Sequence, residues 1–291
     1  MEVFVISMND DRFTTAETNL VEAGFLKTQI VRFPAVDGAL VDLNNETLVS
    51  REVRTHLLGG ESSSDVIKSN KTKLIPSRGA LGCYLSHLKL WKQIAAEGND
   101  AIIAEDDIVF RVSHASEQIE SRWADSKKLG LDLLLLGSSK LPLLPSSVPG
   151  LFHVLDHFFG TEGYVLSAEG AKRLLATALP IKVQVDAYIG SFASSKKLKV
   201  GAVKPSISGQ NHIFVSTVQP QTMQRKVLHA VRIHWLPVLL LVCICIGFLF
   251  MFTSSASASA ASPINSSSPT IQIEVLSENV PNVVTGAKDL K

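Results

Sequence analysis

The sequence of 291 residues has only three cysteines and almost no net charge. Cys243 and Cys245 lie in one apolar run and Cys83 has no CxxC partner, which excludes a disulfide framework, redox chemistry and a four-cysteine zinc site. The 28 basic and 27 acidic residues give a formal net charge of +1, so no overall attraction to a polyanion exists and a nucleic-acid-binding protein is disfavoured. Because 46% of the residues are hydrophobic, the chain can bury a sizeable core.

One long hydrophobic run stands out near the C-terminus. Residues 235–252 read WLPVLLLVCICIGFLFMF and carry no charge, which as a helix is long enough to cross a bilayer. Arg225, Lys226 and Arg232 precede it, and no Lys or Arg follows before Lys288. We therefore predict a transmembrane helix with the N-terminal part in the cytoplasm, the alternative being a buried core helix.

Composition divides the rest of the chain. The first residues, MEVFVISMNDDR, lack the basic start of a signal peptide, so export of the N-terminal part is not expected. Residues 1–220 are predicted to form one folded domain and 221–234 a basic juxtamembrane segment. Residues 253–291 are rich in Ser and Ala at their start and predict a disordered tail.

Strand-like and helix-like patterns alternate through the first two hundred residues. The predicted strands are 3–6, 29–33, 101–110, 131–137 and 163–167; the predicted helices are one that closes at Gly24, one over 79–97, and one over 168–179 with Ser167 as N-cap. This order predicts an α/β fold with a mixed, largely parallel sheet.

Three adjacent carboxylates, Glu105, Asp106 and Asp107, follow an apolar strand segment. Like charges this close repel one another and must be compensated by solvent or by a cation. In an extended segment Glu105 and Asp107 point to one side and Asp106 to the other, so the first and third could share a metal ion beyond the carboxyl end of the strand. A solvated acidic turn is the alternative.

Six segments together resemble glycosyltransferase family 25, which contains lipooligosaccharide-biosynthesis and collagen-modifying galactosyltransferases. They are VFVISMNDDR near the start, RFPAVDG (32–38), SRGALGCYLSHLKLWKQI (77–94), AIIAEDDIVF (101–110), TEGYVLSAEGAKRLL (161–175) and VQVDAYI (183–189). The resemblance implies a GT-A-like nucleotide-sugar-binding domain, a Mn²⁺ or Mg²⁺ ion at the acidic motif, and transfer of a galactose or glucose from a UDP-sugar.

The resemblance also implies residues on the nucleotide side of the site. Ser7 and Arg12 are expected to contact the nucleotide, Arg12 through the diphosphate, unless they are ordinary polar residues at a helix start. Asp37 with Gly38 is expected either to bind the uracil or ribose or to form a structural turn. His87 is expected to be a hydrogen-bonding histidine beside the donor pocket, with an acid/base or ligand role as the less favoured reading.

The metal and catalytic residues follow from the same resemblance. Asp107 is expected to bind the ion, and Glu105 or Asp106 is expected to assist it directly or through water or ribose. His212 could add a nitrogen ligand. Asp186 is the expected base if the reaction inverts the sugar, and a helix-capping aspartate otherwise.

The resemblance extends to the last part of the predicted domain, but it leaves the acceptor open. Gln210 matches the closing segment VKPSISGQNHIF (203–214) and is expected near the bound donor. The acceptor could be a glycan, a glycolipid or a protein hydroxyl, and the predicted membrane helix brings in the lipid bilayer as a partner. The alternative function is a membrane-tethered, catalytically inactive binding or adaptor protein.

Overall fold

The structure is a computed structural model that describes residues 1–59, 75–137 and 143–211. These residues all lie within the first of two units of the chain, Met1–Ile233. The predicted membrane helix at 235–252, the tail at 253–291 and His212 fall outside the described residues. Among the described helices, none combines the length and apolar character needed to cross a membrane.

Helices and strands alternate as the sequence pattern predicts. The strands are β1 (Glu2–Ser7), β2 (Ile30–Pro34), β3 (Ala101–Glu105), β4 (Ile108–Phe110), β5 (Leu133–Leu135), β6 (Leu143–Pro145), β7 (Leu151–Val154), β8 (Gly163–Leu166), β9 (Val200–Val203) and β10 (Ser208–Gln210). The α-helices are α1 (Asp10–Glu22), α2 (Arg51–Leu57), α4 (Arg78–Glu97), α5 (Ala115–Lys128), α6 (Ala168–Leu175) and α7 (Val185–Ser194), and two short 3-10 helices are η1 (Lys27–Gln29) and η2 (Gly38–Leu40).

Eight of these strands form one mixed sheet in the order β2-β1-β3-β8-β5-β9-β7-β6. β1 pairs in parallel with β2 and with β3, and β5 pairs in parallel with β9. β8 runs antiparallel to both of its neighbours, and β7 to both of its own. All strands except β7 and β8 therefore point the same way, which confirms the predicted α/β class with a mixed, mostly parallel sheet.

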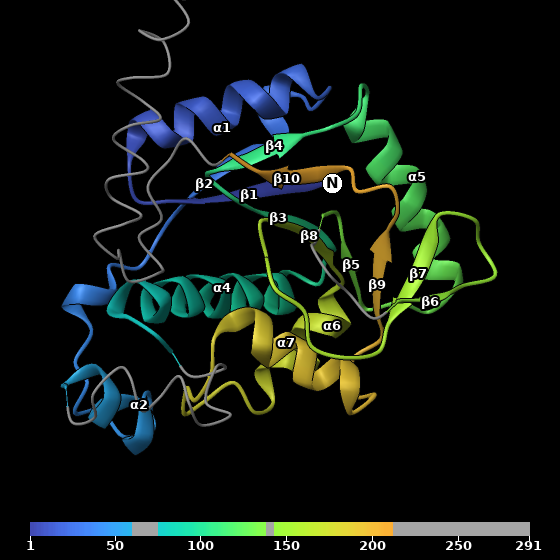
Figure 1. Cartoon of the computed structure of the whole chain (residues 1–291). Coiled ribbons are helices and arrows are strands. Elements are labelled where there is room, and N and C mark those ends of the chain that lie inside the picture. The colour runs from blue at the N-terminus through green and yellow to red at the C-terminus, as the bar shows by residue number, and fades with distance from the viewer. Residues whose placement is uncertain (60–74, 138–142, 212–291) are drawn as a thin grey trace, which may run out of the picture. The chain divides into compact units, whose positions relative to one another are not determined.

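Helices cover both faces of the sheet, with α4, α6 and α7 on one face and α1 and α5 on the other (Figure 1). Alternate residues of β1 supply the two cores, because successive side chains of a strand point to opposite faces. Phe4 and Ile6 join the core beneath α4, whereas Val3 and Val5 join the core beneath α1. A strand buried on both faces is apolar without interruption, as β1 is.

Helix α4 is the longest described helix and lies directly under the sheet. Ser77 caps its first turn by accepting from the Ala80 amide, and Gly98 ends it in the left-handed conformation at φ 74°. The predicted helix over 79–97 is thus confirmed. Its buried face carries Tyr84, Leu88 and Trp91 at helical spacing.

The predicted strand over 101–110 is wrong as a single element. The chain leaves the main sheet after Glu105, turns at Asp106 and Asp107, and continues as β4, which pairs with β10 in a separate two-stranded sheet. Three adjacent carboxylates favour this break, because a strand that continued straight would bury their charges between the neighbouring strands of the sheet, and burying unpaired charges is costly. The acid triplet therefore lies on a turn at the end of β3.

Two glycines allow η2 to touch the first turns of α4. A β-carbon on Gly38 would lie 1.7 Å from the Arg78 carbonyl oxygen, and one on Gly82 would lie 2.4 Å from the Val36 carbonyl oxygen. Asp37 begins η2 by accepting from the Ala39 amide at 2.8 Å. The Asp37-Gly38 pair thus has a structural role in this close backbone contact.

We expect Gly38→Ala to destabilise the fold by about 1–3 kcal/mol, because the added methyl group must push η2 away from α4. Urea unfolding at equilibrium measures the change. The matched control is Ala39→Ser, an exposed position in the same 3-10 helix, for which a change within about 0.5 kcal/mol is expected. Equal stability of Gly38→Ala and the control would show that the contact is not tight.

Candidate active site

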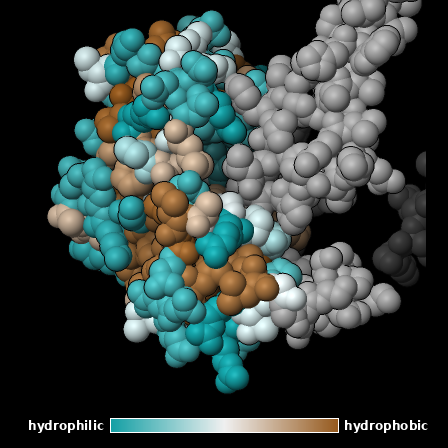
Figure 2. Space-filling model, turned by 90° about the vertical axis from the view of Figure 1, so that its left-hand side faces the viewer, coloured by the Kyte–Doolittle hydropathy of each residue, from teal (hydrophilic) through white to brown (hydrophobic). Residues whose placement is uncertain are grey.

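The carboxyl ends of β1 and β3 lie side by side and carry the predicted acidic site. The two strands are parallel, with Ile6 paired to Glu105. β1 begins at the chain's N-terminus, marked at the centre right of Figure 1, so both strands end toward the left of that view. Figure 2 faces that side and shows hydrophobic residues gathered in the middle and lower part of a mainly hydrophilic surface. Ligands of α/β sheets bind at this end of the strands.

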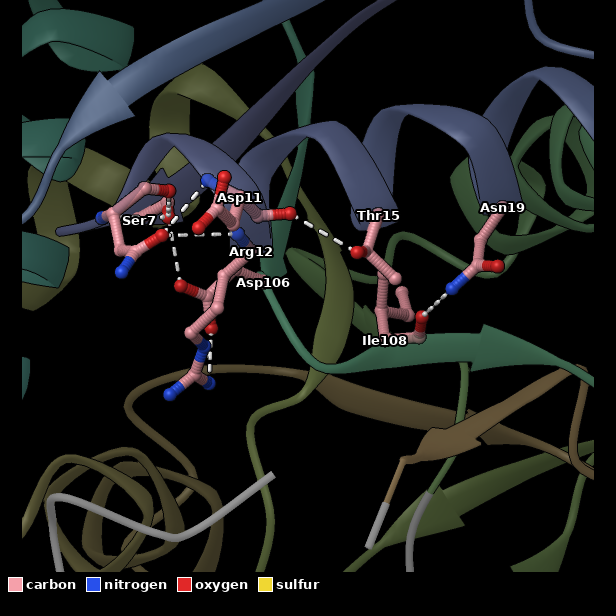
Figure 3. A network of polar contacts seen from close by, with 8 residues as sticks. Ser7, Asp11, Arg12, Thr15, Asn19, Asp106 and Ile108 are labelled. Atoms are coloured by element: carbon pink, nitrogen blue, oxygen red, sulfur yellow. Dashed lines mark hydrogen bonds and ion pairs between the residues drawn. The ribbon is translucent and has the colours of Figure 1, made fainter. Parts of the chain in front are cut away.

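Asp106 is held by two residues, one at the end of β1 and one in the first turn of α1 (Figure 3). The Ser7 hydroxyl donates to Asp106 Oδ2 at 2.7 Å, and Arg12 forms an ion pair with Asp106 Oδ1. Arg12 stands in the first turn of α1, whose N-cap Asn9 accepts from the amides of Asp11 and Arg12. Burial raises the pKa of Asp106, and Ser7 and Arg12 oppose that effect. The structure thus gives Ser7 and Arg12 a shared role in fixing the turn; their predicted contacts with a nucleotide stay predictions.

Glu105 points to the opposite face, toward α4. Its Oε1 accepts from the Thr161 hydroxyl at 2.9 Å and lies 3.6 Å from Nε2 of His87. Burial raises the pKa of Glu105, but the nearby His87 ring and the Thr161 hydroxyl outweigh it and leave the pKa below its usual value. Glu105 is therefore the carboxylate of the triplet that stays charged most readily.

His87 is completely buried within a chain of polar side chains. Its Nδ1 lies 2.8 Å from the Tyr164 hydroxyl, which also accepts from Nε1 of Trp91 at 3.0 Å. The His87 and Tyr164 rings stack with centroids 5.7 Å apart. His87 thus makes the expected kind of hydrogen bond from inside the core, and its predicted place beside a donor pocket stays a prediction.

Asp107 and Glu162 complete the carboxylate group. Burial, reinforced by the charge of Glu105, raises the pKa of Asp107 to about 7, and the same two causes raise the pKa of Glu162 to about 7. Glu162 is only 6% exposed, and its carbonyl oxygen accepts from the Glu105 amide at 3.0 Å. The sequence analysis did not single out Glu162, because a lone Glu before a strand gives no sign that the chain folds it against a distant acidic motif.

Asp186 comes to the same carboxylate group from the other half of the sequence. It stands in the first turn of α7 and accepts from the Ala187 amide at 2.7 Å and from the Gly160 amide at 3.4 Å. Burial raises the pKa of Asp186, backbone amides oppose this, and the Glu105 charge adds to the rise. Gln184 is the N-cap of α7, so Asp186 is not the capping residue that the alternative prediction named.

The remaining predicted residues are placed differently. Gln210 ends β10 opposite Ile108, and the Asn211 amide donates to the Asp107 carbonyl at 2.7 Å, so the closing segment reaches the acid triplet. The expected place of Gln210 near a bound donor stays a prediction. Asp37 caps η2, as described above, and its expected contact with uracil or ribose stays a prediction. His212 lies outside the described residues.

A groove of about 1040 Å³ lies at the opposite end of the same strands. Its lining includes Glu2, Asp100, Trp123 and Lys127. None of the site residues discussed above lines it, and it adjoins the amino ends of β1 and β3. We place the candidate site at the carboxyl ends, because the interacting carboxylates and the closing segment converge there.

The carboxylate group fits a divalent cation of the Mg²⁺ or Mn²⁺ type. Asp107 Oδ1 is buried and has no hydrogen-bond partner among the described residues. An orphaned buried oxygen of this kind is costly unless something pairs with it. Glu105 and Asp107 stand two residues apart at the end of β3, and both offer the carboxylate oxygens that such an ion prefers.

Comparison with known proteins gives the family of the chain. A family model described as "Glycosyltransferase family 25 (LPS biosynthesis protein)" matches residues 1–189. The chain is 31% identical over 188 residues to "Probable inactive glycosyltransferase 25 family member 3" of Bos taurus, covering 60% of this chain and 29% of that protein. It is 34% identical over 122 residues to "Procollagen galactosyltransferase 1-A" of Xenopus laevis, covering 39% of this chain and 20% of that protein.

The fold is that of an α/β domain, and the match over 1–189 decides the family. The chain belongs to glycosyltransferase family 25. It spans less than a third of the length of the two relatives named above. A solved UDP-glucose pyrophosphorylase from Acinetobacter baumanii matches with a TM-score of 0.39 and 12% identity over 72% of this chain and 87% of that one, a likeness too weak to carry an argument.

The raised pKa of Asp107 makes stability depend on pH. Between about pH 4 and about pH 7 the folded state binds more protons at Asp107 than the unfolded state, so in the absence of divalent ions the free energy of unfolding falls as pH rises. The Asn side chain of Asp107→Asn does not titrate, so this variant lacks the loss of stability that Asp107 causes as pH rises. We expect the variant to be more stable than the parent by about 1 kcal/mol or more at about pH 8, and to show a flatter profile from about pH 5 upward.

Urea unfolding at a series of pH values measures this profile. Asp11→Asn serves as the control, since Asp11 is exposed and its removal should leave the slope unchanged. Parallel profiles of Asp107→Asn and the parent would show that the Asp107 carboxyl is not held in its protonated form.

Proposed function

We propose that this chain carries a GT-A-like glycosyltransferase domain that moves a galactose or glucose from a UDP-sugar to a hydroxyl group of a glycan, glycolipid or protein. Membership of family 25 supports the reaction class. The observation that carries the proposal is that Asp186, from the start of α7, joins Glu105 and Asp107 at the end of β3, where the Glu105 charge acts on both of the other two. The name of the Xenopus relative supports galactose as a donor sugar and a protein acceptor.

On the donor side, Glu105 and Asp107 would hold Mn²⁺ or Mg²⁺. The ion would neutralise the negative charge that gathers on the departing UDP. Asp106 has a different task in this proposal: its bonds to Ser7 and Arg12 fix the turn, so that its neighbours keep their direction. The backbone bond from Asn211 to the Asp107 carbonyl ties Gln210 to the same place.

On the acceptor side, Asp186 would take the proton of the attacking hydroxyl group. The Ala187 and Gly160 amides orient its carboxylate. A raised pKa makes a carboxylate a better base, since proton transfer is most efficient when the base titrates near the working pH. This role requires that the transfer invert the anomeric centre.

A second function is favoured by a specific observation. The bovine relative is named as probably inactive, and three further relatives from rat, mouse and human also carry "inactive" in their names. A tethered binding or adaptor protein with the same pocket would keep the fold and bind a sugar nucleotide without turnover.

A panel of UDP-sugars with and without Mn²⁺, measured by release of free UDP, separates the two functions. We expect Mn²⁺-dependent release from UDP-galactose or UDP-glucose, and a loss of about 100-fold or more in Asp107→Ala because a ligand of the charge-stabilising ion is removed. Asp186→Asn should lower transfer to an acceptor more than it lowers donor hydrolysis. The control Asp11→Asn should match the parent.

Donor binding without any UDP release, seen as a shift in thermal stability on addition of UDP-sugar, would instead establish the binding protein. Equal UDP release by the parent and Asp107→Ala would refute the assigned role of the acid triplet.

We also propose that residues 235–252 anchor the chain in a bilayer with the N-terminal domain on the cytoplasmic side. The uncharged run and the basic residues before it support this. The full chain should stay with membranes after extraction at alkaline pH, and Leu241→Arg with Ile244→Arg should release it, because each charge in the middle of the run costs about 2.5–3.5 kcal/mol. Release of the parent chain by the same extraction would overturn the anchor.

A further inference from the structure

Cys83, His87 and Glu105 form a cluster that the carboxylate chemistry above does not use as a whole. Cys83 and His87 are four residues apart on α4 and therefore lie on one face of the helix, and Glu105 reaches them from the end of β3. One ligand atom from each, a sulfur, a ring nitrogen and a carboxylate oxygen, lies within 4.8 Å of the other two. We propose that these three residues form a binding site for a thiophilic divalent cation of the zinc type.

The spacing of the ligand atoms supports a tetrahedral ion. Zn–N and Zn–O bonds of about 2.0–2.2 Å at a tetrahedral angle place the nitrogen and oxygen ligands about 3.3–3.6 Å apart. His87 Nε2 and Glu105 Oε1 are 3.6 Å apart. That separation is too long for a hydrogen bond and suits two ligands of one ion.

The state of the His87 ring is an independent observation. Its Nε2 is buried and has no hydrogen-bond partner among the described residues, while the residue as a whole is completely shielded from solvent. A buried nitrogen without a partner destabilises a fold, so a group that satisfies it is expected. The open nitrogen points toward Glu105, where the ion would bind.

The surroundings provide the outer contacts that metal-binding side chains need. The other ring nitrogen of His87 lies 2.8 Å from the Tyr164 hydroxyl, and Trp91 fixes that hydroxyl from its far side. Thr161 donates to the same Glu105 oxygen at 2.9 Å. Metal ligands are usually oriented by such second contacts, which hold the ring and the carboxylate in place before the ion arrives.

Ligand chemistry separates this site from the one formed by Glu105 and Asp107. A thiolate and an imidazole select zinc-type ions, whereas an all-carboxylate site suits Mg²⁺ or Mn²⁺. Glu105 belongs to both sites, so a zinc ion bound by Cys83 and His87 would compete with Mg²⁺ or Mn²⁺ for the Glu105 carboxylate. The inference of the zinc site itself does not depend on the proposed sugar transfer.

Cobalt titration of the full chain tests the site, because Co²⁺ replaces zinc and gives a visible and near-ultraviolet absorption that reports thiolate ligation. The chain carries Cys243→Ser and Cys245→Ser throughout, which leaves Cys83 as its one remaining thiol. We expect one equivalent of Co²⁺ to give a thiolate-to-cobalt band that Zn²⁺ abolishes. Cys83→Ser should remove the band and weaken Co²⁺ binding at this site by at least about tenfold.

Asp107→Asn is the matched control, since Asp107 belongs to the neighbouring carboxylate site and not to this one. It should keep the band at full intensity, whereas Glu105→Gln should weaken binding with the band still present. Circular dichroism of each variant confirms that it is folded. Absence of a thiolate band in the folded parent, or its persistence in Cys83→Ser, would overturn the proposal.

This experiment uses the metal alone and no sugar nucleotide. A missing cobalt band with intact UDP release would refute the zinc site and leave the proposed glycosyltransferase in place. A cobalt band in a protein that releases no UDP would support the zinc site and count against the glycosyltransferase.

Discussion

The ion pair between Asp106 and Arg12, completed by the Ser7 hydroxyl, is the interaction on which the site depends. It draws the middle carboxylate of the triplet to the α1 face of the sheet and compensates its charge there. Glu105, one position earlier, then faces α4, because side chains alternate along a strand. Without this anchor the three acids would repel one another into solvent. With it, Asp107 stays partly buried beside the charge of Glu105, and the charge of Arg12 partly offsets the rise in the pKa of Asp107.

Crowding of like charges gives the carboxyl ends of β1 and β3 their chemistry. Glu105, Asp107, Glu162 and Asp186 come from different parts of the chain, and the charge of Glu105 raises the pKa of each of the other three. A fold tolerates such a group when a cation or a proton compensates it. The same crowding therefore underlies both the expected fall in stability with rising pH and the proposed binding of a divalent ion.

Much of the fold could be predicted because its signals are local. Three such signals are the uninterrupted apolar run of β1, the spacing of Leu81, Tyr84 and Leu88, and the Ser167 cap. Each is a property of a few neighbouring residues, and the three elements that they predict, β1, α4 and α6, appear in the structure. The strand over 101–110 was predicted as one element because periodicity does not report where a chain leaves a sheet. Its break at Asp106 depends on Ser7, ninety-nine positions away.

The sequence by itself determined the α/β class and the family, since these rest on composition, periodicity and short motifs, and it singled out the acid triplet as the candidate chemical centre. Only the tertiary structure decided that Glu162 joins the triplet, that Asp106 is an anchor, and that Cys83 and His87 face Glu105. The physical reason is distance along the chain. Charge interactions, hydrogen bonds and metal ligation act over a few ångströms in space, and the packing of α4 against the sheet sets which residues come that close.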